Sequence, residues 1–302
     1  MQRLALASVV ANAAIVVTGG AVRLTSSGLG CPTWPRCTSG SYTPTSAYAA
    51  HGVIEFTNRL LTFALTAVVV ATLVAVVRQR PRRTPLVRLA SLLVAGIPAQ
   101  AVLGGITVLT GLNPWTVMAH FLLSMVLLAF AVLLHRRSGE GDGHPRDAAP
   151  LLLRRLSYGV LATVAATLAI GTVVTGSGPH SGDPKAGRTG FDPASVSQLH
   201  ADLVMLLVGL SVALWVALRA AGAPSRAAGM LVLVEVGQAA IGWTQYFTHL
   251  PVVLVGAHLA GACLVLIAAT RVVLSLRERP SAAEDAAVER AAEDPLRVQL
   301  VP

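Results

Sequence analysis

The sequence predicts an all-α polytopic membrane protein with eight transmembrane helices, arranged as two four-helix bundles that a pseudo-twofold axis relates. Composition is the first reason: of the 302 residues, 54% are hydrophobic and only 12% are charged, which is too apolar for an ordinary soluble domain. Length is the second, since crossing roughly 30 Å of hydrocarbon takes about 20 apolar residues and eight windows meet that requirement. The third is an internal repeat, in which residues 238–258 align without a gap on residues 100–120.

The predicted spans follow one another with short connections in places. In chain order they cover about residues 4–22, 52–77, 88–108, 114–135, 156–176, 196–219, 228–246 and 251–274. We expect the first to be a retained helix and not a cleaved signal peptide, because a similar segment recurs later in the chain. The connections at 109–113 and 247–250 are so short that the spans they join must be antiparallel neighbours.

The repeat divides the chain into two halves of four helices with the same orientation. It aligns Gln100 with Gln238, Gly104 with Gly242 and His120 with His258, and spans 1 and 5 end in the similar runs VVTGG and VVTGS. Such parallel repeats are related by an axis along the membrane normal. We therefore expect an N-terminal half at 1–138, a C-terminal half at 139–275 and a mobile, charged cytoplasmic tail at 276–302.

The net charge of +9 indicates orientation and not nucleic-acid binding. Arginines gather between spans 2 and 3, 4 and 5, and 6 and 7, and again after span 8. All of them lie on one side if both termini are cytoplasmic, as the positive-inside rule requires. We expect a multi-pass protein of the cell membrane, surrounded by lipid and with no nucleic-acid partner.

Three histidines fall at one depth near the outer face. His120, His200 and His258 lie about four to seven residues into their spans, or roughly 6 to 11 Å at about 1.5 Å per residue. A single buried histidine is more often a hydrogen-bonded core residue. Two on separate helices of one bundle, His200 and His258, favour axial ligation of a haem iron. Zinc would need further ligands at short spacing, and Gly256 and Gly261 predict room for a flat ring beside His258.

The N-terminal half carries Asn58 and His120 at the corresponding depth, because a weaker alignment of span 6 on span 2 sets Asn58 opposite His200. Glu55 lies one turn before Asn58. It is either an interfacial carboxylate paired with Arg59 or a proton acceptor beside a substrate at Asn58 and His120. Arg59 is also a candidate for binding carboxylates of that substrate, since guanidinium groups match carboxylate geometry.

The first outer loop, residues 23–50, contains Cys31 and Cys37. An oxidising compartment permits a disulfide there. Two interpretations stay open: a structural clip for the long loop, or a reversible dithiol that passes electrons near the histidine layer.

From the first span to the last, the chain resembles the heme A synthase family. The resemblance rests on GGAVRLTSSGLGCPTWPRC after span 1, EFTNR in span 2, MAHF in span 4, QLHADL in span 6 and GAHLAG in span 8. It implies an enzyme that oxidises a methyl group of heme O to a formyl group, giving heme A for a terminal oxidase, with haem b as cofactor in the C-terminal half. It further implies an electron acceptor and a heme O synthase (protohaem farnesyltransferase) as partners, and leaves a homo-oligomer as an open option.

Carried over to this chain, the resemblance assigns His200 and His258 as haem b ligands and His120 as an axial ligand to the substrate haem. Glu55 matches the acidic residue near the reacting centre, and the two outer cysteines match the family's outer-loop pair. Asn58 is a departure, because many members have histidine there. Since asparagine is no substitute for an imidazole ligand, the substrate iron here is expected to be held by His120 alone.

Two other classes of protein explain part of the pattern. A non-catalytic membrane cytochrome b that carries electrons would need the three histidines but neither Glu55 nor the outer cysteines. A transporter built from two parallel halves would line its pathway with the histidines and bind no haem.

Overall fold

The computed structural model describes residues 1–45 and 49–280, which form eight long helices and two short strands. The helices are α1 (Gln2–Leu24), α2 (Ala49–Val77), α3 (Thr84–Leu109), α4 (Pro114–Ser138), α5 (Leu151–Ser177), α6 (Pro193–Ala220), α7 (Arg226–Phe247) and α8 (Val252–Ser275). All eight are long and apolar enough to cross a membrane, which confirms the predicted fold class. Residues 281–302, most of the expected tail, lie outside the described residues.

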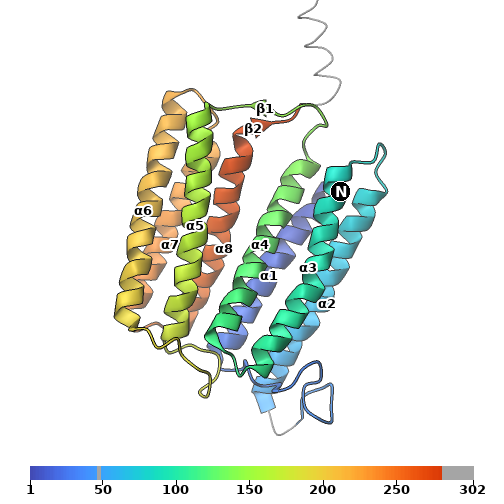
Figure 1. The fold of residues 1–302 in the computed structure, drawn as a ribbon, viewed down its shortest axis with the longest axis vertical. Coiled ribbons are helices and arrows are strands. Elements are labelled where there is room, and N and C mark those ends of the chain that lie inside the picture. Colours follow the sequence, from blue (N-terminus) through green and yellow to red (C-terminus); the bar gives the residue numbers. More distant parts are fainter. Residues whose placement is uncertain (46–48, 281–302) are drawn as a thin grey trace, which may run out of the picture.

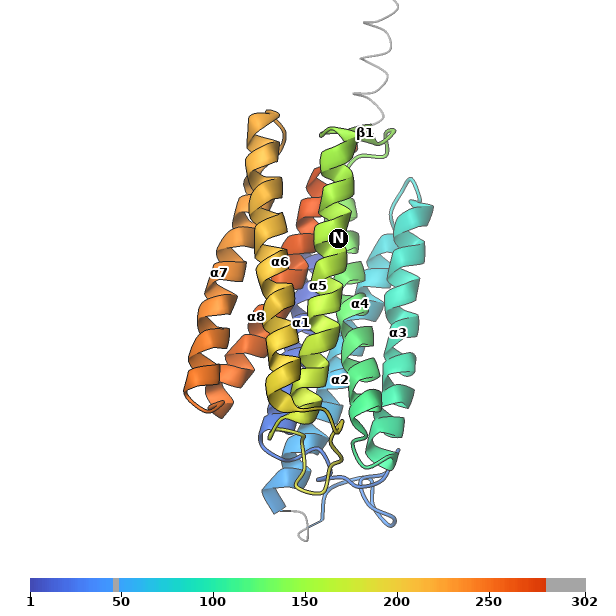
Figure 2. The same ribbon diagram turned by 60° about the vertical axis from the view of Figure 1, so that its left-hand side comes forward.

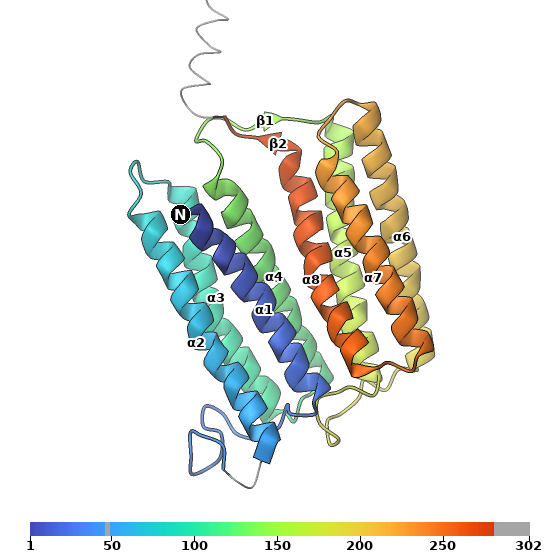
Figure 3. The same ribbon diagram turned by 180° about the vertical axis from the view of Figure 1, so that it is seen from behind.

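The helices pack as two groups of four that meet along α1, α4, α5 and α8 (Figure 1). Within the first group α1 contacts α2 and α4, and α3 contacts α2 and α4; within the second, α5 contacts α6 and α8, and α7 contacts α6 and α8. The order of neighbours is thus the same in both halves, as a repeat with one orientation predicts. The two groups are again distinct from behind (Figure 3), whereas a turn of 60° brings the helices along which they meet into the middle of the view (Figure 2).

Some helices, such as α6, begin before the predicted apolar window, because their first turns contain residues that favour helix N-termini. Pro114 and Pro193 stand at the first helical position, where a missing N–H costs nothing. The Asn113 side chain accepts a hydrogen bond from the Trp115 N–H (3.0 Å), and Asp192 accepts one from the Ser195 N–H (2.8 Å). These caps satisfy backbone donors that hydropathy alone does not register.

The two tight turns of the repeat have the same backbone. Leu112 and Leu250, which the sequence aligns, are both left-handed, with φ of 59° and 58°. Each donates its N–H to the carbonyl five residues earlier, Leu112 to Thr107 (2.9 Å) and Leu250 to Gln245 (2.7 Å). The internal repeat therefore extends from the residue types to the chain conformation.

Large apolar side chains point outward from the helices, as lipid-facing surfaces require. Phe63 is 72% exposed, Leu152 74% and Val253 81%. In water such surfaces would be costly, whereas lipid tails accept them.

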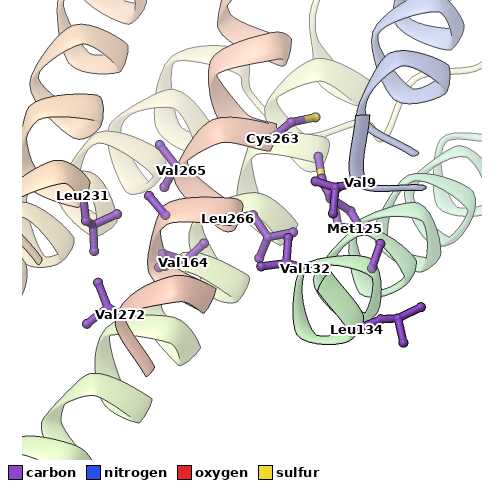
Figure 4. Packing of buried hydrophobic residues seen from close by; sticks show 14 of the residues in the cluster. Val9, Met125, Val132, Leu134, Val164, Leu231, Cys263, Val265, Leu266 and Val272 are labelled. Carbon is purple, nitrogen blue, oxygen red and sulfur yellow. The ribbon is translucent and has the colours of Figure 1, made fainter. Parts of the chain in front are cut away.

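A continuous apolar core joins the halves, with α8 packed on both α1 and α4. Cys263 of α8 lies beside Val9 and Met125, and Leu266 lies beside Val132 (Figure 4). On its other side α8 faces α7, from which Leu231 points toward Val265 (Figure 4). Cys263 is a buried free thiol that contributes apolar packing.

A two-residue antiparallel ladder ties the halves together at the end that carries the N-terminus (Figure 1). Strand β1 (Arg146–Asp147) lies in the connection after α4, and β2 (Arg277–Glu278) follows α8. The first residues of the expected tail are thus paired. The α2–α3 connection lies at this same end, whereas the long loops after α1 and α5 lie at the other, the distribution that the charge pattern predicts (Figure 1).

Candidate haem sites and the outer loop

The imidazole rings of His200 on α6 and His258 on α8 face each other inside the second bundle. Their centroids are 6.4 Å apart and their planes cross at 68°. Both residues are partly buried, and both Nδ1 atoms are buried without a hydrogen bond. The sequence placed these rings at one depth; the structure also turns them toward one another.

This spacing fits a metal ion held between the rings. Two metal–nitrogen bonds of about 2 Å, with a little over 1 Å from each nitrogen to its ring centre, span about 6.3 Å. Among the described residues no group of three or more histidine, cysteine, aspartate or glutamate side chains is placed to hold a metal. The donor set is therefore a pair of imidazoles, which suits the two axial positions of a haem iron and not a tetrahedral zinc.

A glycine on the neighbouring helix positions each of these rings. A Cβ at Gly171 of α5 would lie 3.1 Å from Cε1 of His200 and 4.0 Å from its Nε2. A Cβ at Gly242 of α7 would lie 3.1 Å from Cε1 of His258. Each ring therefore rests its Cε1 edge on bare backbone, which leaves its nitrogens as the groups available for a ligand.

The two glutamines that the repeat aligns each donate a hydrogen bond to the backbone of a histidine. Gln238 donates from Nε2 to the backbone carbonyl of His258 (2.7 Å), and Gln100 donates to that of His120 (3.1 Å). The Gln238 side chain also fills the space beside Gly261, where a Cβ would overlap it. The expectation that Gly261 leaves room for a flat ring is therefore wrong, because an amide that positions the histidine helix occupies that space.

In the first bundle, His120 and Asn58 take the corresponding positions. A Cβ at Gly104 of α3 would lie 3.1 Å from Cε1 of His120, and one at Gly19 of α1 would lie 3.9 Å from Nδ2 of Asn58. The Nδ1 atom of His120 and the Oδ1 atom of Asn58 are buried without hydrogen bonds. The N-terminal half thus contains the same type of site with one imidazole replaced by an amide.

Glu55 is buried and engaged through both carboxylate oxygens. Oε1 accepts from Nη2 of Arg59 (2.6 Å) and from its Nε (3.1 Å), and Oε2 accepts from the Cys31 N–H (2.7 Å). Arg59 also donates to the carbonyls of Cys31 (3.0 Å) and Thr33 (3.2 Å). The predicted pairing of Glu55 with Arg59 exists, but it is not a snorkelling contact: the pair fixes the outer loop onto α2.

Cys31 and Cys37 form a disulfide, so the predicted pairing is confirmed. Between them, Trp34 lies against α3, where a Cβ at Gly105 would overlap its indole ring. Gly105 adjoins Gly104, which supports His120. The loop that Glu55 and Arg59 hold therefore covers the α3 backbone beside the first-bundle site.

Arg23 connects the two outer loops. From the end of α1 it donates to the carbonyls of His180 (2.6 Å) and Thr175 (3.0 Å) in the second half. His180 in turn contacts the Leu250 carbonyl through Nε2 (2.9 Å). The guanidinium groups of both Arg23 and Arg59 are thus occupied by backbone carbonyls.

Sequence reasoning missed two features of the site. It did not assign a role to Gly19 and Gly171. A glycine where one helix packs closely against another is a signal in the sequence that could have identified both. Sequence reasoning also missed the Ser211 hydroxyl, which donates to Oε1 of Glu235 (2.8 Å) deep in the second bundle. The other carboxylate oxygen of Glu235 is buried without a partner.

The sequence is similar to a known protein family and to named members of other organisms. The sequence model of the COX15-CtaA family, described as cytochrome oxidase assembly protein, matches residues 2–180, more than half of the chain. A protein named heme A synthase from Symbiobacterium thermophilum is 35% identical over 144 residues, covering 47% of this chain and 46% of its own. Another protein of that name, from Exiguobacterium sibiricum, is 28% identical over 152 residues, covering 49% of this chain and 50% of its own. The matched part of the chain spans about half the length of these curated relatives.

Proposed function

The chain belongs to the COX15-CtaA family of cytochrome oxidase assembly proteins, and from that premise we propose that it is a heme A synthase. The proposed reaction oxidises a methyl group of heme O to a formyl group. The names of both relatives support it. The observation that carries it is the pair of imidazoles of His200 and His258, 6.4 Å apart inside a membrane bundle.

The second bundle is the proposed haem b site. When bound, haem b would supply one-electron redox chemistry. His200 and His258 would bind it through a ring nitrogen, while the bare backbone at Gly171 and Gly242 accommodates their Cε1 edges. Gln238 fixes the height of His258 by its hydrogen bond to the backbone carbonyl.

The first bundle is the proposed heme O site, with His120 as the axial ligand and Asn58 on the opposite helix pair. Arg59 is the proposed binding residue for substrate carboxylates; its side chain is 23% exposed, and a carboxylate would replace the 3.4 Å contact of Nη1 with the Arg36 carbonyl while Nη2 holds the loop. Glu55 is the proposed residue for proton handling, since oxidising a methyl to a formyl group takes its oxygen from water and releases the removed hydrogens as protons, with the electrons passing to the acceptor. An electron acceptor is a required partner, and heme O synthase is the proposed source of the substrate.

The experiment is to express the chain together with heme O synthase and to purify it. A reduced-minus-oxidised spectrum and extraction of the haems then show what is bound. The proposal expects haem b together with heme O and heme A. Haem b with no conversion of added heme O would instead identify a membrane cytochrome b that carries electrons, and no haem at all would exclude both.

The role of Glu55 has its own test. Glu55→Gln keeps the size and most contacts of the side chain and removes its proton-accepting carboxylate. Heme A should fall while haem b stays. Undiminished heme A would eliminate the proposed role.

A further inference from the structure

An arginine-rich cavity is lined mainly by the α2–α3 connection. This connection lies at the end of the molecule that carries the N-terminus (Figure 1). The volume of the cavity is about 380 Å³, within the range of about 300 to 1,000 Å³ typical of small-molecule sites. The α2–α3 connection, the end of α4 and the α4–α5 connection line it, together with Arg279 after α8. The cavity therefore lies at the end of the first bundle, where the segment after α8 reaches it, far along the helices from the histidines.

The charged groups in this cavity do not balance. Arg82, Arg83, Arg137 and Arg279 line it, with Asp142 as the one acidic lining residue. Arg83 pairs with Asp142, and Arg137 is 3.6 Å from Oε2 of Glu140. The side chains of Arg82 and Arg279 make no hydrogen bond or ion pair with another residue of the described chain. Arg83 and Arg279 also repel Arg137 electrostatically.

A smaller cavity with a mixed charged and apolar lining, which includes Glu140 and Arg277, adjoins the charged one. It has a volume of about 130 Å³ and shares Arg137 and Arg279 with the first, and Leu133, Val273 and Leu274 contribute to its wall. These leucines and the valine belong to the last turns of α4 and α8, at the edge of the membrane-spanning segments. Charged and apolar surfaces thus meet as they do where a lipid headgroup joins its chains.

We infer that this cavity binds a phosphate group, carried either by the headgroup of an anionic phospholipid or by a soluble phosphate. Guanidinium forks match phosphate oxygens in charge and geometry, and a phosphate between Arg82, Arg137 and Arg279 would relieve the repulsion between Arg137 and Arg279. The leucines and the valine of the adjoining cavity, at the ends of α4 and α8, favour the lipid. Because Arg137 is in the last turn of α4 and Arg279 follows α8, the bound phosphate would link the first bundle to the segment after α8.

The test compares the purified full chain with the double variant Arg82→Gln/Arg279→Gln. Neither side chain has a structural partner in the described chain, so the variant is expected to fold. The matched control is Arg78→Gln/Arg226→Gln, which removes the same charge from exposed positions outside the cavity. Each protein is titrated with phosphatidylglycerol, phosphatidylcholine or inorganic phosphate, and binding is followed by native mass spectrometry and the thermal unfolding midpoint.

Wild type and control should bind phosphatidylglycerol and unfold at a higher temperature with it than with phosphatidylcholine. The cavity variant should bind it about tenfold more weakly, the loss of about 1.4 kcal/mol expected for charge-assisted contacts. If inorganic phosphate alone gives the same stabilisation and the same dependence on Arg82 and Arg279, the ligand is a soluble phosphate. Equal binding by cavity variant and control, or no response of wild type to either phosphate source, would overturn the inference.

Discussion

Gly19 of α1 lies against Asn58 of α2 in the way that a glycine lies against a histidine in the other three helix pairs. Gly104 supports His120, and the corresponding glycines of α5 and α7 support the two histidines of the second bundle. Four helix pairs therefore present a polar side chain at one level over bare backbone. Asn58 is the single position of the four without an imidazole.

Replacing Asn58 by histidine should complete the first site. The space beside Gly19 accepts a ring edge, so the new imidazole is expected to lie opposite His120. In protein loaded with heme O, Asn58→His should increase the low-spin signal in electron paramagnetic resonance. The control is Thr57→His, one residue away on a different helix face. An unchanged spectrum in Asn58→His would mean that the two side chains do not face a common iron.

The glycine supports predict a size limit. Gly242→Ala would place a Cβ 3.1 Å from Cε1 of His258, so the ring must shift by a few tenths of an ångström. We expect haem affinity to fall about tenfold, as for other supports of metal ligands. Gly237→Ala is the control on the same helix, because nothing lies within 4 Å of its added Cβ. The haem content of each purified variant is the measurement. Equal loss of haem in Gly242→Ala and Gly237→Ala would show that Gly242 does not support the His258 ring.

The paired histidines predict loss of a specific haem. His258→Ala leaves His200 as a lone ligand, so the low-spin haem signal of the second bundle should disappear. His249→Asn, at an exposed left-handed position that asparagine tolerates, should leave the spectrum as it is. A second variant also replaces His120, so that no haem bound in the first bundle contributes to the spectrum. A low-spin spectrum that remains in this variant would contradict His200 and His258 as the ligands of one haem.

The contacts of Glu55 predict a protected disulfide. Glu55→Ala removes charge-assisted bonds to Arg59 and to the Cys31 N–H, worth about 1.5 to 3 kcal/mol. A soluble dithiol should then reduce Cys31–Cys37 roughly ten times faster or more, measured by alkylation and mass spectrometry. Glu140→Ala, which loses its ion pairs to Arg136 and Arg137 at the opposite end, serves as the control. Identical reduction rates would show that the loop is held in another way.

The buried carboxyl of Glu235 predicts unequal costs for two serine substitutions. Ser211→Ala leaves both oxygens of Glu235 without a partner and should destabilise the protein by about 1 to 3 kcal/mol. Ser8→Ala also removes a buried side-chain bond, to Thr72, but Thr72 keeps backbone acceptors, so about 0.6 kcal/mol is expected. Unfolding midpoints in one detergent compare them. A larger loss in Ser8→Ala would refute this ranking.

The sequence was sufficient for features that depend on composition and on position along a helix. Hydropathy defined the eight helices, because every spanning segment must be long and apolar. The repeat identified His120 and His258 and placed them at one depth, since depth follows from residue count and helical rise. The cysteine pair and the family resemblance also followed from residues alone.

Only the tertiary structure decided which way each side chain points. These helices are apolar nearly all round, so their sequences have no clear hydrophobic stripe to indicate the inward face. That His200 faces His258, that Glu55 holds the Cys31 backbone, and that Gln238 fills the space at Gly261 all depend on helix rotation and on neighbours distant in the chain. Helical rise fixes height within the membrane, whereas direction within it is set by packing.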